Sequence, residues 1–245
     1  MNDPIVQVDW GSLGPEEQRA FFSEEGYLVV PQAIDPDHLR SLHEEIERYQ
    51  LQRWTEDWWH APSFERLIET PKMVTALENL LGPGIKFFKG VYVSILPPGS
   101  TGSRPVRQRL HKDYDPYGSG GKDFRNSSPS WINCGCYLTD LTLEHAPLWV
   151  VPGSHRDYRF GPGMDLEGTA DKAKMVLARA GDVVFFYCMT THAGGANTSN
   201  IARRSAFYSY RAAWAKPVGP INEWPSEYVE RAPMERKRLL VGLND

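Results

Sequence analysis

The 245-residue sequence is poor in cysteine, has no long apolar run and carries no excess of basic charge. Its three cysteines, Cys134, Cys136 and Cys188, are too few for a disulfide framework or a four-thiolate zinc site, so we interpret them as core thiols in a reducing compartment. No segment approaches the roughly 18 consecutive apolar residues that a membrane helix needs. The net charge of −4 argues against a nucleic-acid partner, because phosphate binding needs a concentrated basic surface.

The start of the chain, Met1 to Trp10, has neither the basic residues nor the unbroken apolar stretch of a signal peptide. We therefore expect a cytoplasmic protein with no membrane segment. Hydrophobic residues make up 41% of the sequence and charged residues 24%, a balance that allows a sizeable core. We expect a single domain over residues 1–245, with a mostly helical part at 1–82, a jelly-roll core at 83–215 and a C-terminal extension at 216–245 that wraps the surface.

Helices are predicted in the first third of the chain. Pro15 and Pro36 each stand at the start of a segment whose apolar residues have helical spacing. A third helix is expected from Met73 to Leu81, where Gly82-Pro83-Gly84 ends it. Between the first two helices, Tyr27 to Pro31 is typical of a short strand.

From Lys86 onward, short β-prone runs alternate with turn residues. The predicted strands are Phe87–Leu96, Trp131–Leu138, Leu148–Val151, Lys174–Leu177, Asp182–Tyr187 and Arg203–Arg211. Because helices precede strands, the expected fold is mainly β with a helical layer (α+β), an antiparallel jelly roll with N-terminal helices packed on one sheet.

His111, Asp113 and His192 are the candidate metal ligands. On an extended backbone, residues two apart point to the same face, so His111 and Asp113 can reach one ion. An imidazole with a carboxylate suits iron(II), and a second histidine completes a facial triad that leaves positions open for oxygen. His192 follows an apolar run and precedes two glycines, which let ligands approach the backbone closely. A His-x-Asp triplet alone is a weak signal, because it arises often by chance.

Arg203 and Ser205 strengthen the hypothesis. They share one face of a predicted strand, and a guanidinium fork beside a hydroxyl is a good receptor for a carboxylate. Arg204 is expected to point outward. The reverse facing, with arginines on the surface of an edge strand, stays open from sequence.

Seven short motifs follow one another along the chain from residue 80 onward. They are Leu80-Leu81-Gly82-Pro83, Leu96-Pro97-Pro98-Gly99, His111-Lys112-Asp113, Leu138-Thr139-Asp140, Pro147 to His155, Ala180 to Phe186, and His192 with Asn197 and Arg203. In this order they resemble the phytanoyl-CoA dioxygenase family of iron(II)/2-oxoglutarate oxygenases. The set is specific, although any single member would be weak.

The resemblance implies a double-stranded β-helix (jelly roll, cupin-like) fold. It also implies Fe(II) on His111, Asp113 and His192, with 2-oxoglutarate as a cosubstrate whose distal carboxylate lies on Arg203 beside Ser205. With O2, such an enzyme hydroxylates or otherwise oxidises an unactivated C–H bond of a small-molecule metabolite and releases succinate and CO2.

Asp113 fills the position that a halide takes in related halogenases, so halogenation is disfavoured, whereas desaturation, epimerisation and cyclisation stay open. His155 maps to a structural turn. The sequence departs from the family at Lys112, where Gln is common, and at His145-Ala146, which replaces Asn-Gly.

Substrate contacts are expected around the metal triplet, from a basic and aromatic cluster suited to a small polar or anionic molecule. The candidates are Lys112, Tyr114, Tyr117 and Arg107, with Arg109 nearby. The two arginines are equally consistent with solvated charges on an edge strand. A tryptophan cluster, Trp54, Trp58 and Trp59, is interpreted as packing, with a lid as the weaker alternative.

Two other functions compete with this interpretation. A cupin-like metal-dependent dioxygenase or isomerase would not use 2-oxoglutarate, and Arg203 argues against it because that class needs no carboxylate clamp there. A jelly-roll ligand-binding protein without metal is disfavoured by the intact triad. A small-molecule substrate is the partner expected; the sequence does not define an oligomeric state.

Overall fold

The computed structural model describes residues 5–51, 61–100, 106–113, 131–157, 167–215 and 224–240. Its strands are β1 (Tyr27–Val30), β2 (Lys86–Leu96), β3 (Trp131–Tyr137), β4 (Leu148–Val150), β5 (Lys174–Val176), β6 (Val183–Tyr187), β7 (His192–Gly194) and β8 (Arg203–Arg211). Its α-helices are α1 (Pro15–Glu25), α2 (Pro36–Arg48), α3 (Pro62–Leu67), α4 (Pro71–Leu81), α5 (Glu167–Ala170), α6 (Ser226–Arg231) and α7 (Met234–Leu240). Two 3-10 turns are η2 (Val106–Gln108) and η4 (Ser154–Arg156).

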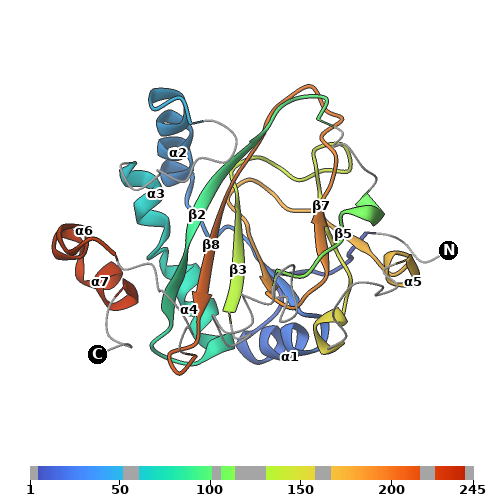
Figure 1. The fold of residues 1–245 in the computed structure, drawn as a ribbon, viewed down its shortest axis with the longest axis horizontal. Coiled ribbons are helices and arrows are strands. Elements are labelled where there is room, and N and C mark those ends of the chain that lie inside the picture. The colour runs from blue at the N-terminus through green and yellow to red at the C-terminus, as the bar shows by residue number, and fades with distance from the viewer. Residues whose placement is uncertain are drawn as a thin grey trace, which may run out of the picture.

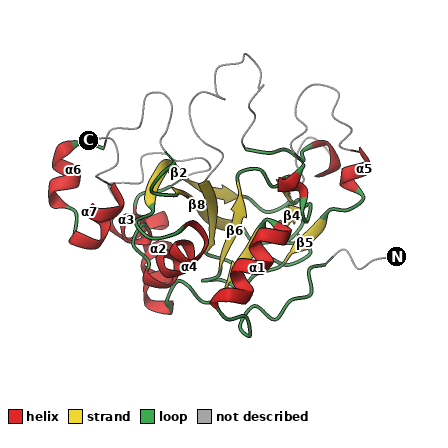
Figure 2. Cartoon of the chain, turned by 90° about the horizontal axis from the view of Figure 1, so that it is seen from below, coloured by secondary structure: helices red, strands yellow, loops and turns green. Residues whose placement is uncertain are grey.

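The strands form two antiparallel sheets. The larger sheet has the order β1-β6-β3-β8-β2 and the smaller β5-β4-β7. Figure 1 shows α2, α3, α6 and α7 on one side of the larger sheet and the smaller sheet on the other. Seen from below, this helical layer and the strands β4 and β5 again lie on opposite sides of β6 and β8 (Figure 2). The arrangement confirms the predicted fold, a jelly roll with helices on one sheet.

Two buried clusters hold the layers together. The larger cluster joins the helical layer to the outer face of the large sheet, with Leu42, Phe64 and Tyr208 among its members. A smaller cluster, including Val29 and Val150, lies between the two sheets. Burial of apolar surface supplies about 25 cal/mol per Å² and is the main force that fixes these layers.

Local sequence explains where the first helices begin and end. The Asp35 side chain accepts a hydrogen bond of 2.8 Å from the main-chain N–H of His38, and Pro36 fills the first turn of α2, where no N–H is needed. At the C-terminal end of α1, Gly26 has a φ of 80°, the left-handed conformation that glycine adopts without strain.

Alternation along β8 assigns its side chains to the two layers. Tyr208 and Tyr210 face the helices and donate their hydroxyls to Phe64 O at 2.8 Å and Ile68 O at 2.7 Å. The odd-numbered residues from Arg203 to Arg211 therefore face the space between the sheets. Arg204 faces the helical layer, as its pairing below shows.

The C-terminal extension differs from the expectation that it wraps the surface. It contains α6 and α7, and Leu239 is fully buried in the larger core cluster. Arg236 is buried as well, with hydrogen bonds of 2.7 Å to Glu65 and to Glu69. A charged residue at a buried helical position hides the apolar periodicity by which these short helices could be predicted. No helix within the described ranges has the length and apolar character of a membrane span.

Candidate metal centre

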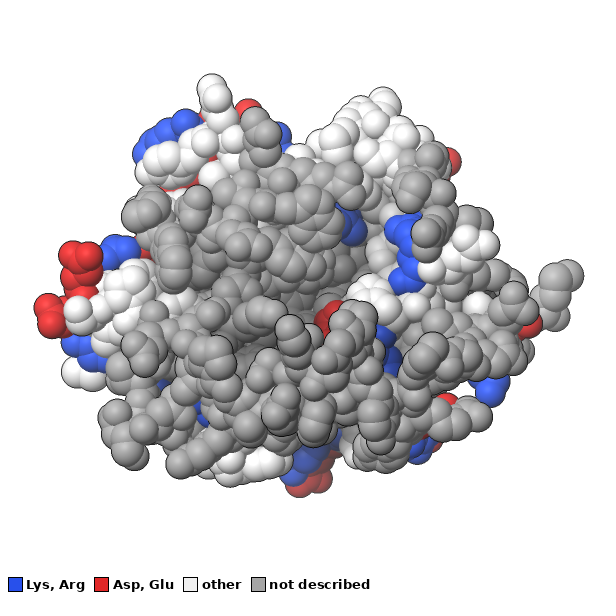
Figure 3. All heavy atoms as spheres, in the orientation of Figure 1, with Lys and Arg blue, Asp and Glu red and all other residues white. Residues whose placement is uncertain are grey.

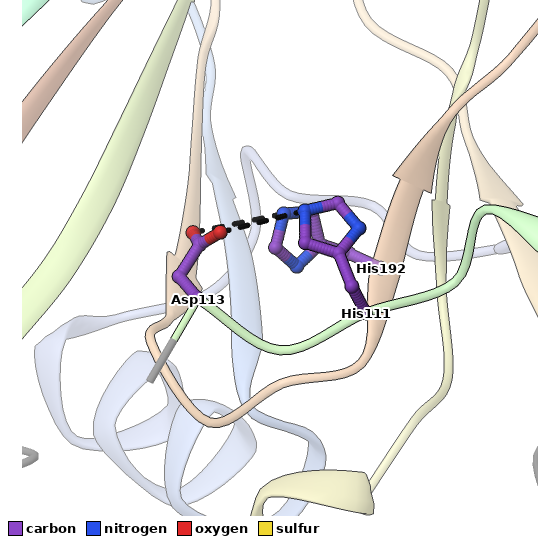
Figure 4. Close-up of side chains that lie close together, drawn as sticks. All are labelled: His111, Asp113 and His192. Atoms are coloured by element: carbon purple, nitrogen blue, oxygen red, sulfur yellow. Dashed lines mark ion pairs between the residues drawn. The ribbon is translucent and has the colours of Figure 1, made fainter. Parts of the chain in front are cut away.

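His111 and His192 are held side by side by their own backbones. They form an isolated antiparallel bridge, with His111 N donating to His192 O at 3.0 Å and His192 N donating to His111 O at 2.9 Å. Their ring centroids are 4.5 Å apart. Figure 4 shows that His111 and Asp113 come from one segment and His192 from another. Two residues far apart in sequence are thus joined by a pair of main-chain hydrogen bonds.

Asp113 completes the group from the same segment as His111. Its N–H donates to Cys188 O at 3.0 Å. Its Oδ1 lies 3.5 Å from His111 Nε2, and its Oδ2 lies 3.7 Å from His192 Nε2. One ligand atom from each of the three residues lies within 4.8 Å of the others, a spacing that allows a single ion to contact all three. The structure therefore brings the three predicted ligands together.

The imidazole rings present the correct nitrogens. His111 Nδ1 lies 2.8 Å from Arg109 O, and His192 Nδ1 lies 2.9 Å from Thr190 O. A carbonyl oxygen can only accept a hydrogen bond, so each Nδ1 carries the proton and each Nε2 keeps its lone pair. Such a bond also fixes the orientation of the ring, as is usual for histidines that bind metals.

The two histidines differ in their electrostatic surroundings. The hydrogen bond to Asp113 raises the pKa of His111, against the opposing effect of its partial burial. Burial lowers the pKa of His192, which is enclosed and packs against the Phe186 ring at 4.5 Å between centroids. His192 thus forms the buried wall of the site, whereas Asp113 and His111 keep exposed surface.

Asn133 and Ser209 support the carboxylate and were not predicted. Asn133 Nδ2 donates to Asp113 Oδ2 at 2.6 Å, and Ser209 Oγ donates to Asn133 Oδ1 at 2.6 Å. The Ser209 hydroxyl donates to the oxygen of the Asn133 amide, and this leaves the amide nitrogen facing Asp113. A signal was present in the sequence, since Asn133 is a polar residue within an otherwise apolar strand, but its partners come from distant segments.

Arg203 and Ser205 lie on the inner face of β8, as the predicted alternation requires, and both are buried. The Arg203 guanidinium donates to Ala146 O at 3.3 Å and to Ser94 Oγ at 3.5 Å, and Ser205 Oγ donates to Ser94 O at 3.4 Å. These contacts to neutral acceptors are long. Arg204 lies on the opposite face, where it pairs with Glu47 and donates to His43 Nδ1 at 3.1 Å.

The predicted substrate contacts are only partly within the described residues. Lys112 Nζ donates to Ser154 O at 2.9 Å and to Asp157 O, which ties the triplet to η4, and its role toward a substrate stays a prediction. The backbone of Arg107 lies in η2. Its side chain, Tyr114, Tyr117 and the tryptophan cluster lie outside the described residues. His155 is in η4, with Nε2 3.0 Å from Ser23 O, in agreement with a structural turn.

The space-filling view gives the setting of these groups. The face drawn in Figure 3 is hollowed near its centre, with Lys and Arg side chains along one side of the hollow and an acidic side chain at its other side.

Sequence comparisons relate the chain to known proteins. Residues 61–205 match the family model described as phytanoyl-CoA dioxygenase (PhyH). An ectoine dioxygenase from Bordetella parapertussis is 22% identical, over 86% of this chain and 80% of its own length. The dioxygenase andF from Emericella variicolor is 25% identical, over 91% and 84%. The peroxisomal phytanoyl-CoA dioxygenase of Mus musculus is 22% identical, over 77% and 66%.

Solved structures share the fold. The epimerase SnoN in complex with Fe3+, alpha ketoglutarate and nogalamycin RO superposes with a TM-score of 0.68 at 23% identity, covering 84% of this chain and 87% of SnoN. EctD from S. alaskensis with 2-oxoglutarate and 5-hydroxyectoine also gives 0.68, at 21% identity and 86% and 82% coverage. At these identities the likeness shows the fold.

Proposed function

Because the chain belongs to the phytanoyl-CoA dioxygenase family, we propose that it is an iron(II)- and 2-oxoglutarate-dependent oxygenase that oxidises a C–H bond of a small-molecule metabolite. The observation that carries the proposal is the convergence of His111, Asp113 and His192, with their ligand atoms within 4.8 Å of one another. Hydroxylation is the outcome we propose first, with release of succinate and CO2.

The donor set fits iron(II). Two imidazoles and one carboxylate form a mixed nitrogen and oxygen set, and three of six octahedral positions remain for other ligands. Both Nε2 atoms are available because both Nδ1 protons are bound to carbonyl oxygens. When bound, iron(II) with 2-oxoglutarate and O2 supplies the oxidising power for cleavage of a C–H bond.

The inner face of β8 fits the cosubstrate. Arg203 and Ser205 are buried side by side between the sheets, where a guanidinium and a hydroxyl can hold the distal carboxylate of 2-oxoglutarate. Two of the hydrogen bonds that Arg203 makes are to neutral oxygens, at 3.3 and 3.5 Å. Charge-assisted hydrogen bonds to a carboxylate are shorter and about twice as strong, so the cosubstrate would replace weak contacts with stronger ones.

The protein's own residues orient and enclose the reactants. The backbone bridge between His111 and His192 spaces the imidazoles, and Asn133 holds one oxygen of Asp113. The buried side of the site is closed by Phe186 beside His192. Exclusion of water from this side limits side reactions and strengthens the electrostatic interactions within the site. Asp113 supplies the third protein ligand, so the centre has no vacancy for a halide of the kind that halogenation needs.

The proposal is tested by absorption spectroscopy. Anaerobic addition of iron(II) and 2-oxoglutarate to the metal-free protein should give a visible charge-transfer band. Asp113→Ala should lose the band, whereas Asp140→Ala should keep it, because the Asp140 carboxylate accepts from Ala180 N away from the site. Arg203→Met should require more 2-oxoglutarate for the same band, and Arg204→Met should not.

The outcomes separate the competing functions. Absence of a band in the wild type would overturn the proposal. Iron binding without a band on addition of 2-oxoglutarate would instead favour the cupin-like enzyme that does not use it.

A further inference from the structure

Arg211 is a second buried guanidinium on the inner face of β8. It is the last residue of that strand and lies two residues beyond Ser209, so both side chains point to the same side of the sheet. In register it lies opposite Trp131 of β3 on one side and Lys86 of β2 on the other. The proposed function assigns no role to this residue.

Among the described residues, the partners of Arg211 use little of its hydrogen-bonding capacity. Only 6% of the residue is exposed. In the described parts of the chain its guanidinium makes one hydrogen bond, from Nη1 to Ala215 O at 3.0 Å, and no ion pair. A buried cation is costly unless it is paired, and the described residues offer Arg211 no counter-ion.

A second positive charge, on Lys86, adds to the cost of burying Arg211. Lys86 lies directly across from Arg211, and like charges at opposite positions of neighbouring strands destabilise a sheet. The Lys86 ammonium is turned to Arg238 O at 2.6 Å. Burial, and the positive charge of Arg211 after it, lower the pKa of Lys86, and burial lowers the pKa of Arg211. An anion placed at Arg211 would relieve both effects.

Two independent paths place Arg211 close to the metal ligands. Along the inner face, Ser209 is joined through Asn133 to Asp113 by two hydrogen bonds of 2.6 Å. Along the backbone, Asp113 N–H donates to Cys188 O, and Cys188 N–H donates to Trp131 O, next to Arg211 in register. With strands about 4.8 Å apart and residues about 3.3 Å apart along them, the guanidinium can reach to within roughly 10 Å of Asp113.

We propose that Arg211 binds an oxyanion of the substrate, a carboxylate or a phosphate, and that the substrate of this enzyme is therefore an anionic small molecule. Arg203 would hold the cosubstrate at one end of β8 and Arg211 the substrate at the other, with the metal ligands between them. The guanidinium fork matches either oxyanion in two-point hydrogen bonding. That the bound anion is the substrate rests on the proposed function, whereas the presence of an anion site does not.

The test uses small fluorinated probes with the full-length protein. Manganese(II), which accepts the same donors, and saturating 2-oxoglutarate are added first, so that the metal ligands and Arg203 are occupied. The probes are 4-fluorobenzoate, 4-fluorophenyl phosphate and the neutral 4-fluorobenzamide. Fluorine NMR measures both the affinity of each probe and the relaxation that the paramagnetic ion causes, which reports the distance between the two.

We expect at least one anion to bind saturably and to be relaxed by manganese(II), and the amide to bind at least about tenfold more weakly. Preference for benzoate or for the phosphate identifies the oxyanion. Arg211→Met should reduce anion binding at least about tenfold, and so should Arg211→Gln, which keeps a donor for Ala215 O but no charge. Arg204→Met, on the opposite face of the same strand, is the matched control and should leave binding unchanged.

Stability distinguishes recognition from a structural role. Replacing a buried, unpaired charge by an apolar residue of similar size is expected to leave the melting temperature of Arg211→Met unchanged or to raise it. A lower melting temperature in both variants, equal binding of amide and anions, no anion binding in the wild type, or unchanged binding in the variants would overturn the proposal.

The same samples separate this inference from the proposed function. If manganese(II) or 2-oxoglutarate fails to bind, the proposed function fails. Calorimetry of the two anions with metal-free wild-type and Arg211→Met protein then still decides whether Arg211 forms an anion site.

Discussion

Removal of the Asn133 amide should weaken metal binding although Asn133 is not a ligand. Its Nδ2 donates to Asp113 Oδ2 at 2.6 Å, a short hydrogen bond to a charged group. Such bonds contribute about 1.5–3 kcal/mol, and about 1.4 kcal/mol corresponds to a factor of ten in an equilibrium constant. Asn133→Ala should therefore raise the dissociation constant for iron(II) by about ten- to hundredfold, the range found for residues that orient metal ligands.

Anaerobic calorimetry of iron(II) binding measures this effect directly. Ser209→Ala should have a smaller effect in the same direction, because Ser209 only fixes the orientation of the Asn133 amide. Asn133→Asp should weaken binding at least as much as alanine, since it places a second carboxylate beside Asp113 and removes the donor. Cys134→Ala is the matched control, because that side chain lies on the other face of β3 within the helical core.

The control should lower thermal stability and leave iron affinity unchanged. An unchanged dissociation constant in folded Asn133→Ala would refute the argument. It would mean that the backbone bridge and the ion fix Asp113 without help from the amide.

Three further predictions concern stability. Arg236→Met should lower the free energy of unfolding by about 3–5 kcal/mol in urea denaturation, because Glu69 loses its buried ion pair and Glu65 keeps only its pair with the exposed Arg231. Arg238→Met, at an exposed pair, should cost less than about 1 kcal/mol, and equal losses would contradict this. Gly26→Ala should lower the free energy of unfolding by about 2–4 kcal/mol, since its Cβ would lie 2.4 Å from His155 Nδ1 at a φ of 80°. Gly84→Ala, with a φ of 74° and its nearest neighbour at 3.8 Å, introduces the backbone strain without the steric clash and should lower the free energy of unfolding clearly less. Burial lowers the pKa of three histidines outside the metal centre, so these side chains bind more protons in the unfolded chain than in the folded one near pH 6.5. The stability measured by urea denaturation should therefore fall as the pH drops from 7.5 to 5.5, and a rise on acidification would exclude this linkage. These histidines are His38, His43 and His155.

Local patterns in the sequence were sufficient for most of the fold. Pro15 and Pro36 mark the starts of α1 and α2, and Arg203–Arg211 matches β8 residue for residue. These signals are local, because capping and alternation depend on neighbours along the chain. The short helix α3 and the two helices after residue 224 were missed, since six or seven residues give too few turns for a periodic pattern to stand out.

The geometry of the metal centre could be predicted only in part from local sequence patterns. Spacing alone could place His111 and Asp113 on one face, but their distance from His192 depends on a backbone bridge between remote segments. The inner facing of Arg203 follows from the packing of its neighbours on the helices, which no pattern within β8 contains. Asn133 and Ser209 were missed for the same reason, because each acts through a partner on a segment distant in sequence.

The paired hydrogen bonds between His111 and His192 have a consequence for the choice of ion. The backbone spaces the two imidazoles before an ion binds, so binding of the ion requires little reorganisation of these ligands. The ranking of affinities should then follow the intrinsic preferences of the divalent ions, in which cobalt and nickel exceed iron(II). Occupancy by iron in a cell would depend on supply rather than on discrimination by the protein, and nickel or cobalt should act as tight inhibitors.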